Sequence, residues 1–290
     1  MKKLLDRIFI DGLGGMAQGL FATLIIGTII QQIGLFMGGG TGDLIYELGK
    51  IAAGLTGAGI GVGVARKLEA GHLVIVSAAV VGMIGAFAGK ILSGQVLVDG
   101  NLVLAGPGEP LGAFAAAYLA IEIGILISGK TKLDIILTPL VCIGTGSAVG
   151  LFVGPPISEF MLWLGSLINW GTEQQPFLMG IVVSVLMGMI LTLPISSAAL
   201  GVILNLSGLA AGAATIGCCC NMIGFAVASW RENKFSGFLA QGIGTSMLQI
   251  PNIVRRPLIW LPVILSSAVL GPIGTMLLHM TNNATGSGMG

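Results

Sequence analysis

Charge is what this 290-residue sequence has least of. Its 13 Lys and Arg and 12 Asp and Glu make up 9% of the chain, whereas soluble domains carry roughly 25%. So few charges could not cover the surface of a soluble protein of this length. The net charge of +1 provides no basic field for nucleic acid, so we expect no nucleic-acid partner.

Histidine and cysteine are also scarce, with two His and four Cys. Four Cys exclude a disulfide-rich scaffold. Three of them, Cys218, Cys219 and Cys220, are contiguous, and neighbouring side chains on a helix point about 100° apart and cannot converge on one metal ion. No Ser/His/Asp or Cys/His set can be assembled, so we expect no catalysis by this chain, no metal and no cofactor.

Apolar residues make up 54% of the sequence, and there are 48 Gly. About 20 apolar residues cross a bilayer, and eight runs approach that length, which predicts an all-α, multi-pass membrane protein with about 8–10 transmembrane helices. Gly spaced four apart, as in Gly57 with Gly61 and Gly59 with Gly63, predicts close helix packing. The runs are Leu13–Leu35, Leu44–Val64, Leu73–Leu92, Leu111–Ser128, Leu133–Val153, Phe177–Leu193, Leu206–Ser229 and Leu258–His279.

Eleven of the 13 basic residues fall into four clusters. Short loops rich in Lys and Arg stay in the cytoplasm, which predicts a cytoplasmic N-terminus. The runs alone put the last cluster on the wrong side, so one or two re-entrant hairpins are expected, with Ile157–Trp170 and Ile195–Leu206 as candidates. The clusters are Lys2, Lys3 and Arg7; Arg66 and Lys67; Lys130 and Lys132; and Arg231, Lys234, Arg255 and Arg256.

Glu122 is the clearest ionisable residue at membrane depth. It lies in the middle of an apolar run, one turn after Tyr118. A carboxylate in this position is costly, so it is a candidate proton or ion site. The alternative is a structural pair, although the sequence assigns it no charged partner.

Two polar breaks interrupt the apolar runs in the second half of the chain. Glu173, Gln174 and Gln175 lie between a Gly and a Pro, and a carboxylate with two amides can bind the hydroxyls of a sugar or another polyol. An ordinary aqueous loop is the alternative for this break. Ser196, Ser197 and Asn205 form the second break, where they either contact a solute or satisfy backbone groups freed by the broken helix.

Asn221 and Glu109 complete the set of candidate solute-binding residues. Asn221 lies within an apolar run, where a buried amide needs partners. Glu109 lies one residue before a Pro that opens a helix. It either lines an entrance or is a solvated loop residue.

Seven long motifs together resemble one family, the bacterial enzyme-IIC-like membrane proteins of the sugar phosphotransferase system that are often labelled toxin regulators. The resemblance covers nearly the whole chain and implies a bacterial cytoplasmic membrane. The motifs are GPGEPLGAF (Gly106–Phe114), SGKTKLDI (Ser128–Ile135), VGPPIS (Val153–Ser158), TEQQPF (Thr172–Phe177), LTLPISSAAL (Leu191–Leu200), LNLSGLAAGAATIGCC (Leu204–Cys219) and GTSMLQIPNIVRRP (Gly244–Pro257).

A more distant similarity links the chain to glucose-type sugar permeases. Their Gly-Ile-Thr-Glu-Pro motif carries a Glu that binds the sugar in a re-entrant hairpin. Here Gly171–Pro176 lacks the Ile and has Gln174 and Gln175 before the Pro. The resemblance implies that Glu173 is the carboxylate that contacts the sugar.

The resemblance also implies how the chain is organised. Permeases of this class look like homodimers with an elevator-type movement of the binding domain. We therefore expect scaffold or dimerisation helices in 1–153, broken solute-binding helices in 154–257, and a last helix and tail in 258–290. Family members continue further, so we expect a truncated chain whose end, Gly286–Gly290, is a flexible loop.

Two functions stay open at this point. The first is a transporter of a small polar solute, a sugar or related polyol. The IIA and IIB domains, which carry the phosphorylated His and Cys of this system, are not in the sequence, so phosphorylation of a solute would need separate cytosolic partners. The second is a membrane sensor or regulator with a degenerate IIC fold that binds a ligand without net transport.

Overall fold

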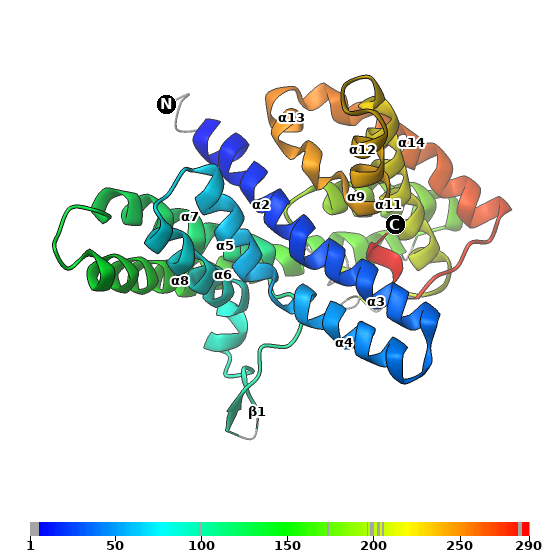
Figure 1. Ribbon diagram of the computed structural model, residues 1–290. Helices are drawn as coiled ribbons and strands as arrows, with labels where there is room; N and C mark the ends of the chain where they lie inside the picture. Colours follow the sequence, from blue (N-terminus) through cyan, green and yellow to red (C-terminus); the bar gives the residue numbers. More distant parts are fainter. Residues whose placement is uncertain are drawn as a thin grey trace. The chain divides into compact units, whose positions relative to one another are not determined.

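Helices make up nearly all of the regular structure in the computed structural model (Figure 1). The model describes residues 6–98, 100–172, 174–195, 197, 200–201, 204, 206–283 and 286–289. The chain divides into two compact units, Met1–Ser158 (unit 1) and Glu159–Gly290 (unit 2). The scaffold and binding roles expected for 1–153 and 154–257 stay predictions.

Unit 1 begins with a nearly continuous helix that contains two π-helical segments, and it includes one short β-hairpin. Its last helix, α8, continues past the unit boundary. The elements are η1 (Arg7–Gly12), α2 (Leu13–Leu20), η2 (Phe21–Ile25), α3 (Ile26–Met37), α4 (Gly39–Gly54), α5 (Thr56–Lys67), α6 (His72–Leu92), β1 (Leu97–Val98), β2 (Asn101–Leu102), α7 (Pro110–Ile127) and α8 (Asp134–Thr172).

Unit 2 contains three longer helices, which contact one another, and several short helical turns. The elements that follow α8 are α9 (Pro176–Thr192), α11 (Gly208–Ala228), α12 (Trp230–Leu239), η3 (Ala240–Gly244), η4 (Ser246–Gln249), α13 (Ile250–Arg255), η5 (Pro257–Trp260), α14 (Leu261–Pro272), η6 (Ile273–Leu277) and η7 (Gly286–Gly288).

The eight apolar runs coincide with helices, which confirms the all-α, multi-pass class. Within the described ranges, six helices are long and apolar enough to cross a membrane, or up to seven if the bent pair α4 and α5 forms one span. The apolar helix α9 is shorter, with 17 residues. The six are Arg7–Met37, His72–Leu92, Pro110–Ile127, Asp134–Ile157, Gly208–Ala228 and Pro257–Leu277.

Glycine contacts define the directions of the first helices in unit 1. Gly15 and Gly19 of α2 face Gly63 and Gly59 of α5, so the two helices are antiparallel. A Cβ at Gly15, Gly19 or Gly63 would overlap the backbone of the facing helix. The small-residue spacing therefore brings helices together inside one bundle, as the sequence predicted.

The next helices of unit 1 alternate in direction in the same way. Gly57 faces Gly82 and Gly61 faces Ala78, which makes α5 and α6 antiparallel. Gly124 of α7 lies beside Val74, near the start of α6. The end of α7 is therefore at the same end of the bundle as the start of α6.

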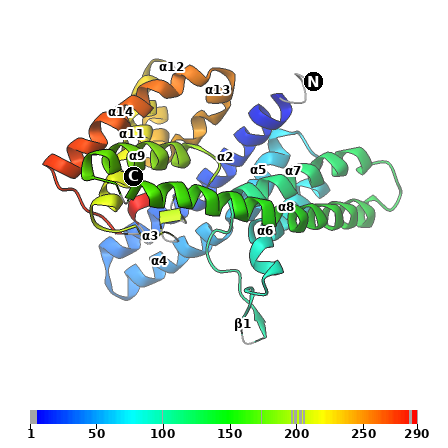
Figure 2. The same cartoon turned by 180° about the vertical axis from the view of Figure 1, so that it is seen from behind.

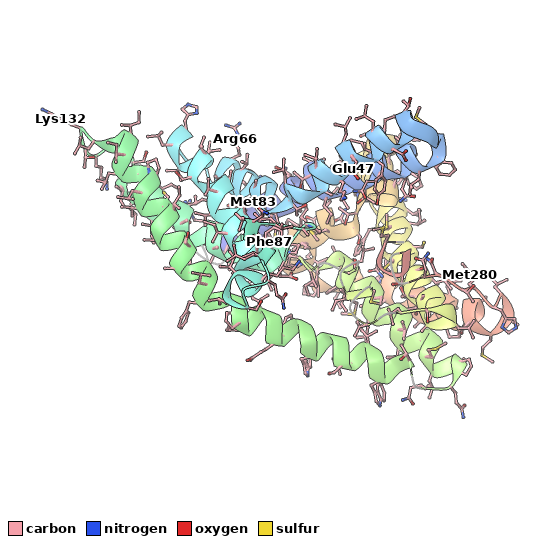
Figure 3. The ribbon with its side chains drawn as sticks, turned by 90° about the horizontal axis from the view of Figure 1, so that it is seen from below. Glu47, Arg66, Met83, Phe87, Lys132 and Met280 are labelled. Carbon is pink, nitrogen blue, oxygen red and sulfur yellow. The ribbon has the colours of Figure 1, made fainter. Side chains whose placement is uncertain are left out.

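These directions bring the clustered basic residues of unit 1 to one end. The β1–β2 hairpin and the connection 93–109 lie at the opposite end. In Figure 3, Arg66 and Lys132 lie towards one end of this unit, and Met83 and Phe87 lie deeper along α6. The residues at the basic end are Arg7, Arg66, Lys67, Lys130 and Lys132.

In unit 2, α9 and α11 run in the same direction. Gly217 of α11 packs against Ser184 of α9, and further along both helices Asn221 bonds to Thr192. Helix α14 runs the opposite way, because its residue Ser267 lies beside Ser184, and Thr275 of η6, which follows α14 directly, lies beside the start of α9. Figures 1 and 2 show the three helices side by side.

Because α9 and α11 run in the same direction, the chain between them must return from the end of α9 to the level of its start. The stretch 193–207, which we call the first broken segment, must lead back along α9, which is about 26 Å long. The sequence left two candidates for the missing crossing. Ile157–Trp170 is a continuous part of α8, whereas Ile195–Leu206 lies in this return connection.

Candidate functional site

The end of the chain folds back into unit 2. After η6 the backbone turns at His279, which has a φ of 46°, and the Asn282 N–H donates to the Gly208 carbonyl over 3.2 Å. The Asn282 amide also donates to the Thr215 hydroxyl over 2.7 Å. We call the stretch 278–289 the second broken segment. It was expected to end in a flexible loop, but Ser287 is fully buried.

The two broken segments meet about halfway along α11. The Ser197 hydroxyl of the first segment donates to the Gly288 carbonyl of the second over 2.7 Å. The Cys218 thiol of α11 lies 3.7 Å from the Met187 carbonyl and 3.9 Å from the Ser287 carbonyl. We call Ser197, Cys218, Ser287 and Gly288 the segment junction.

The two segments reach this junction from opposite ends of the unit 2 helices. The first leaves α9 at Thr192, which lies beside Asn221 of α11. Trp260, directly before the start of α14, contacts the same Asn221. The second passes Gly208 and Thr215 before it reaches the level of Cys218. This travel along α11 corresponds to about 15 Å. A helix that is interrupted at such depth, as α9 is at Leu193, is tolerated only where its freed backbone groups are buried in protein or line a cavity.

A second polar cluster surrounds Asn221, which is fully buried on α11. Its amide nitrogen donates to the Gly217 carbonyl over 3.1 Å and to the Ser267 hydroxyl over 3.3 Å. Its amide oxygen accepts from the Thr192 hydroxyl and the Trp260 indole N–H, each over 3.2 Å. Protein groups therefore lie at all four hydrogen-bonding positions of the amide. The Thr192 hydroxyl also lies 3.1 Å from the Gly188 carbonyl, so its one proton is shared between two acceptors.

The cluster extends to Ser246, whose hydroxyl lies 2.7 Å from that of Thr192. We call these five residues the Asn221 network. Because protein groups occupy every position of the amide, contact between Asn221 and a solute stays a prediction. The network members are Thr192, Asn221, Ser246, Trp260 and Ser267.

Of the other predicted solute-binding residues of unit 2, the structure describes Gln174, Gln175 and Ser197. Glu173, Ser196 and Asn205 lie outside the described residues. The Gln174 amide donates to the Trp170 carbonyl over 3.1 Å, and Gln175 is exposed at the start of α9. About three helical turns of α9 separate that start from the level of Met187.

Glu109 caps the first turn of α7 in unit 1. Its carboxylate accepts from the Leu111 N–H over 3.4 Å, and its own N–H donates to the Ala86 carbonyl over 2.7 Å. Removal from water raises the pKa of the Glu109 carboxyl to about 7, and the bond from Leu111 only partly opposes this. Glu109 is therefore half-buried at the hairpin end of unit 1 rather than a freely solvated loop residue.

Glu122 has a charged partner that the sequence did not identify. The Arg7 guanidinium donates to its carboxylate over 2.6 and 3.3 Å. The hydroxyl of Tyr118, one turn away, is buried and is the one buried side-chain polar atom without a hydrogen-bond partner in the part of the chain described here. The ion pair supports the structural alternative for Glu122, while a proton or ion site stays a prediction.

The polar side chains of the segment junction and the Asn221 network share one chemical property. They are hydroxyls, an amide, an indole N–H and a thiol, all uncharged. Within the described ranges no three His, Cys, Asp or Glu residues lie close enough to hold a metal ion. The interior of unit 2 thus offers neutral hydrogen-bonding groups, which match the hydroxyls of a polyol.

These features define a helical, multi-pass membrane protein whose second unit carries broken, polar segments between apolar helices. The sequence profile of the family described as phosphotransferase system, EIIC, matches residues 10–290. The chain therefore belongs to this family, which is the sugar-type membrane transport component of that system and works with its partner components. No match was found among curated proteins or among solved structures.

Proposed function

We propose that this chain is the permease of a neutral sugar or related polyol, and that the solute binds within unit 2. The observation that carries the proposal is the segment junction, where Ser197 of the first broken segment meets the short η7 turn of the second between apolar helices. Transporters place their solute sites near the bilayer midplane, at discontinuous helices. Only uncharged groups meet here, which suits a solute without charge.

The proposed site has two parts, separated along α9. One part is the junction around Ser197, and the other is Glu173, which the family resemblance assigns to the sugar. Pro176, three residues after Glu173, begins α9, and its carbonyl accepts from the Thr275 hydroxyl of η6 over 2.9 Å. We propose that Glu173 and its amide neighbours receive the solute at this end and that the junction holds it deeper.

We propose that the basic end of unit 1 faces the cytoplasm of a bacterial cell, with the N-terminus inside. Five basic residues support this orientation because short basic loops are retained in the cytoplasm. The family resemblance supports a homodimer in which unit 1 is the scaffold and unit 2 moves as an elevator. It also supports separate cytosolic IIA and IIB partners for phosphorylation.

Reconstituted proteoliposomes test this function. The purified chain should take up at least one of radiolabelled glucose, N-acetylglucosamine and mannitol, and the Glu173→Ala variant should lose that uptake. Glu159→Gln is the matched control, because Glu159 is an exposed carboxylate of the same unit. Full uptake by Glu173→Ala would exclude this role of Glu173. Saturable binding without flux would instead support the sensor function.

A further inference from the structure

The Asn221 network meets the first broken segment at its origin. Thr192 is the last residue of α9, and the extended backbone of Leu193 follows it, with a ψ of 161°. The Thr192 hydroxyl is fully buried and contacts both the Asn221 amide and the Ser246 hydroxyl. The direction in which the first broken segment leaves α9 is therefore set beside these groups.

The network has little freedom to rearrange. Asn221 uses both donors and both acceptor positions on protein groups, and a fully satisfied buried network holds its members in one arrangement. Gly188 provides the space for the amide, because a Cβ at Gly188 would overlap the Asn221 nitrogen. Loss of one hydroxyl would leave a buried partner unsatisfied.

The network also connects the first broken segment to the stretch that contains Arg255 and Arg256. Trp260 ends η5 and Ser246 begins η4, so both belong to the stretch 246–260, which includes Arg255 and Arg256. The Trp260 indole is partly exposed, whereas Asn221 is not. A change of position in 246–260 would therefore reach Thr192 directly from Ser246, and also from Trp260 by way of Asn221.

We propose that Asn221 is a positioning residue: with Thr192, it holds the start of the first broken segment so that Ser197 reaches the segment junction. The inference rests on the proposed function, because the junction is the proposed solute site. Its consequence is a change in affinity rather than in the turnover of bound solute. If loss of the network makes the competent arrangement ten times rarer, the apparent dissociation constant rises about tenfold.

Thr192→Val tests the inference, because it keeps the shape of the side chain and removes the hydroxyl. We expect about a tenfold higher KM with an unchanged maximal rate, using the sugar of the panel that wild type takes up best. Thr192→Ser keeps the hydroxyl and should restore the wild-type KM. Thr56→Val is the matched control, since Thr56 is an equally buried Thr that bonds only to the Ala53 carbonyl, in unit 1.

A second measurement works without any solute. Fluorine NMR of the full chain labelled with fluorotryptophan, with the Trp260 signal assigned from Trp260→Phe, reports on the network directly. That signal should shift in Thr192→Val and Asn221→Ala, but not in Thr56→Val or Thr192→Ser. An unshifted signal in Thr192→Val would overturn the inference, whatever the chain transports. So would a wild-type KM in Thr192→Val, whereas failure of the wild-type chain to bind any sugar would count against the proposed function alone.

Discussion

Arg7 and Glu122 are 115 positions apart in the sequence, yet the guanidinium Nε lies 2.6 Å from the carboxylate Oε1. The pair joins η1 to α7, at the end of unit 1 where the clustered basic residues lie. Both side chains are partly exposed, with 38% and 30% of their surfaces accessible. The pair thus places a cation directly beside the Glu122 carboxylate.

Breaking this pair should destabilise unit 1. Arg7→Gln leaves the half-buried Glu122 carboxylate without its partner, and we expect a loss of about 1–3 kcal/mol. Thermal unfolding in detergent measures this. The exchanged pair, Arg7→Glu with Glu122→Arg, should recover most of the loss, and an equal loss in the exchanged pair would show that charge pairing is not the cause.

The Lys50–Glu47 pair is the matched control for this measurement. Its atoms are 3.4 Å apart, and both side chains are more than half exposed. Exposed pairs of this kind contribute about 0–1 kcal/mol. Lys50→Gln should therefore leave the unfolding temperature close to that of wild type.

Helix packing by glycine gives a second prediction. The Cβ of Gly61→Ala would overlap the Ala78 carbonyl on α6, so we expect a loss of about 1–3 kcal/mol. Gly54, at the end of the preceding helix, has open space around it, and Gly54→Ala should be neutral or stabilise by up to about 1 kcal/mol. Equal unfolding temperatures for the two variants would contradict the packing seen between α5 and α6.

Glu109 gives the pH dependence. Its folded pKa of about 7 lies above the ordinary value of 4.5, so its contribution to stability is fully present below pH 4.5 and is lost as the pH rises to about 7. The loss is at most about 3 kcal/mol. Glu109→Gln, which stays neutral, should flatten the stability profile between these pH values. A profile as steep as that of wild type would assign the slope to another group.

Ser197 tests the segment junction. Ser197→Ala removes the hydrogen bond that the Ser197 hydroxyl donates to the Gly288 carbonyl. We expect about a tenfold loss of solute affinity, because the two broken segments are no longer joined there. Equilibrium binding of the transported sugar to the purified chain measures this. Ser166→Ala is the control, since Ser166 is exposed and bonds to the Trp163 carbonyl within its own helix. Equal affinities for the two variants would exclude the junction from the site.

The helices could be predicted because each depends on residues close together in the sequence. An apolar run of about 20 residues identifies a span wherever its partners lie, and Gly57 and Gly61 indicated close packing without naming the facing helix. In the structure the facing helix is α6, whose Gly82 and Ala78 contact Gly57 and Gly61. Local pattern thus determined the elements but not their neighbours.

The candidate site could be predicted only in part, for the same reason. Its amides and hydroxyls were visible as polar breaks, but three partners of Asn221, namely Thr192, Trp260 and Ser267, lie far from it in the sequence. Arg7 was counted among the basic residues that orient the chain, and no spacing rule links it to Glu122. The second broken segment was missed because small and polar residues near Ser287 are equally typical of an exposed loop.

Helix α8 has a consequence for how this chain can vary in evolution. It is 39 residues long, continues from unit 1 into unit 2, and contains Pro155 and Pro156 just before the boundary at Ser158. Ordinary domain linkers tolerate insertions because they are flexible. In a helix, one added residue turns the helical residues after it by about 100° and advances them by about 1.5 Å. An insertion between Gly146 and Gly154 would therefore turn one of these glycines away from α6, which both contact.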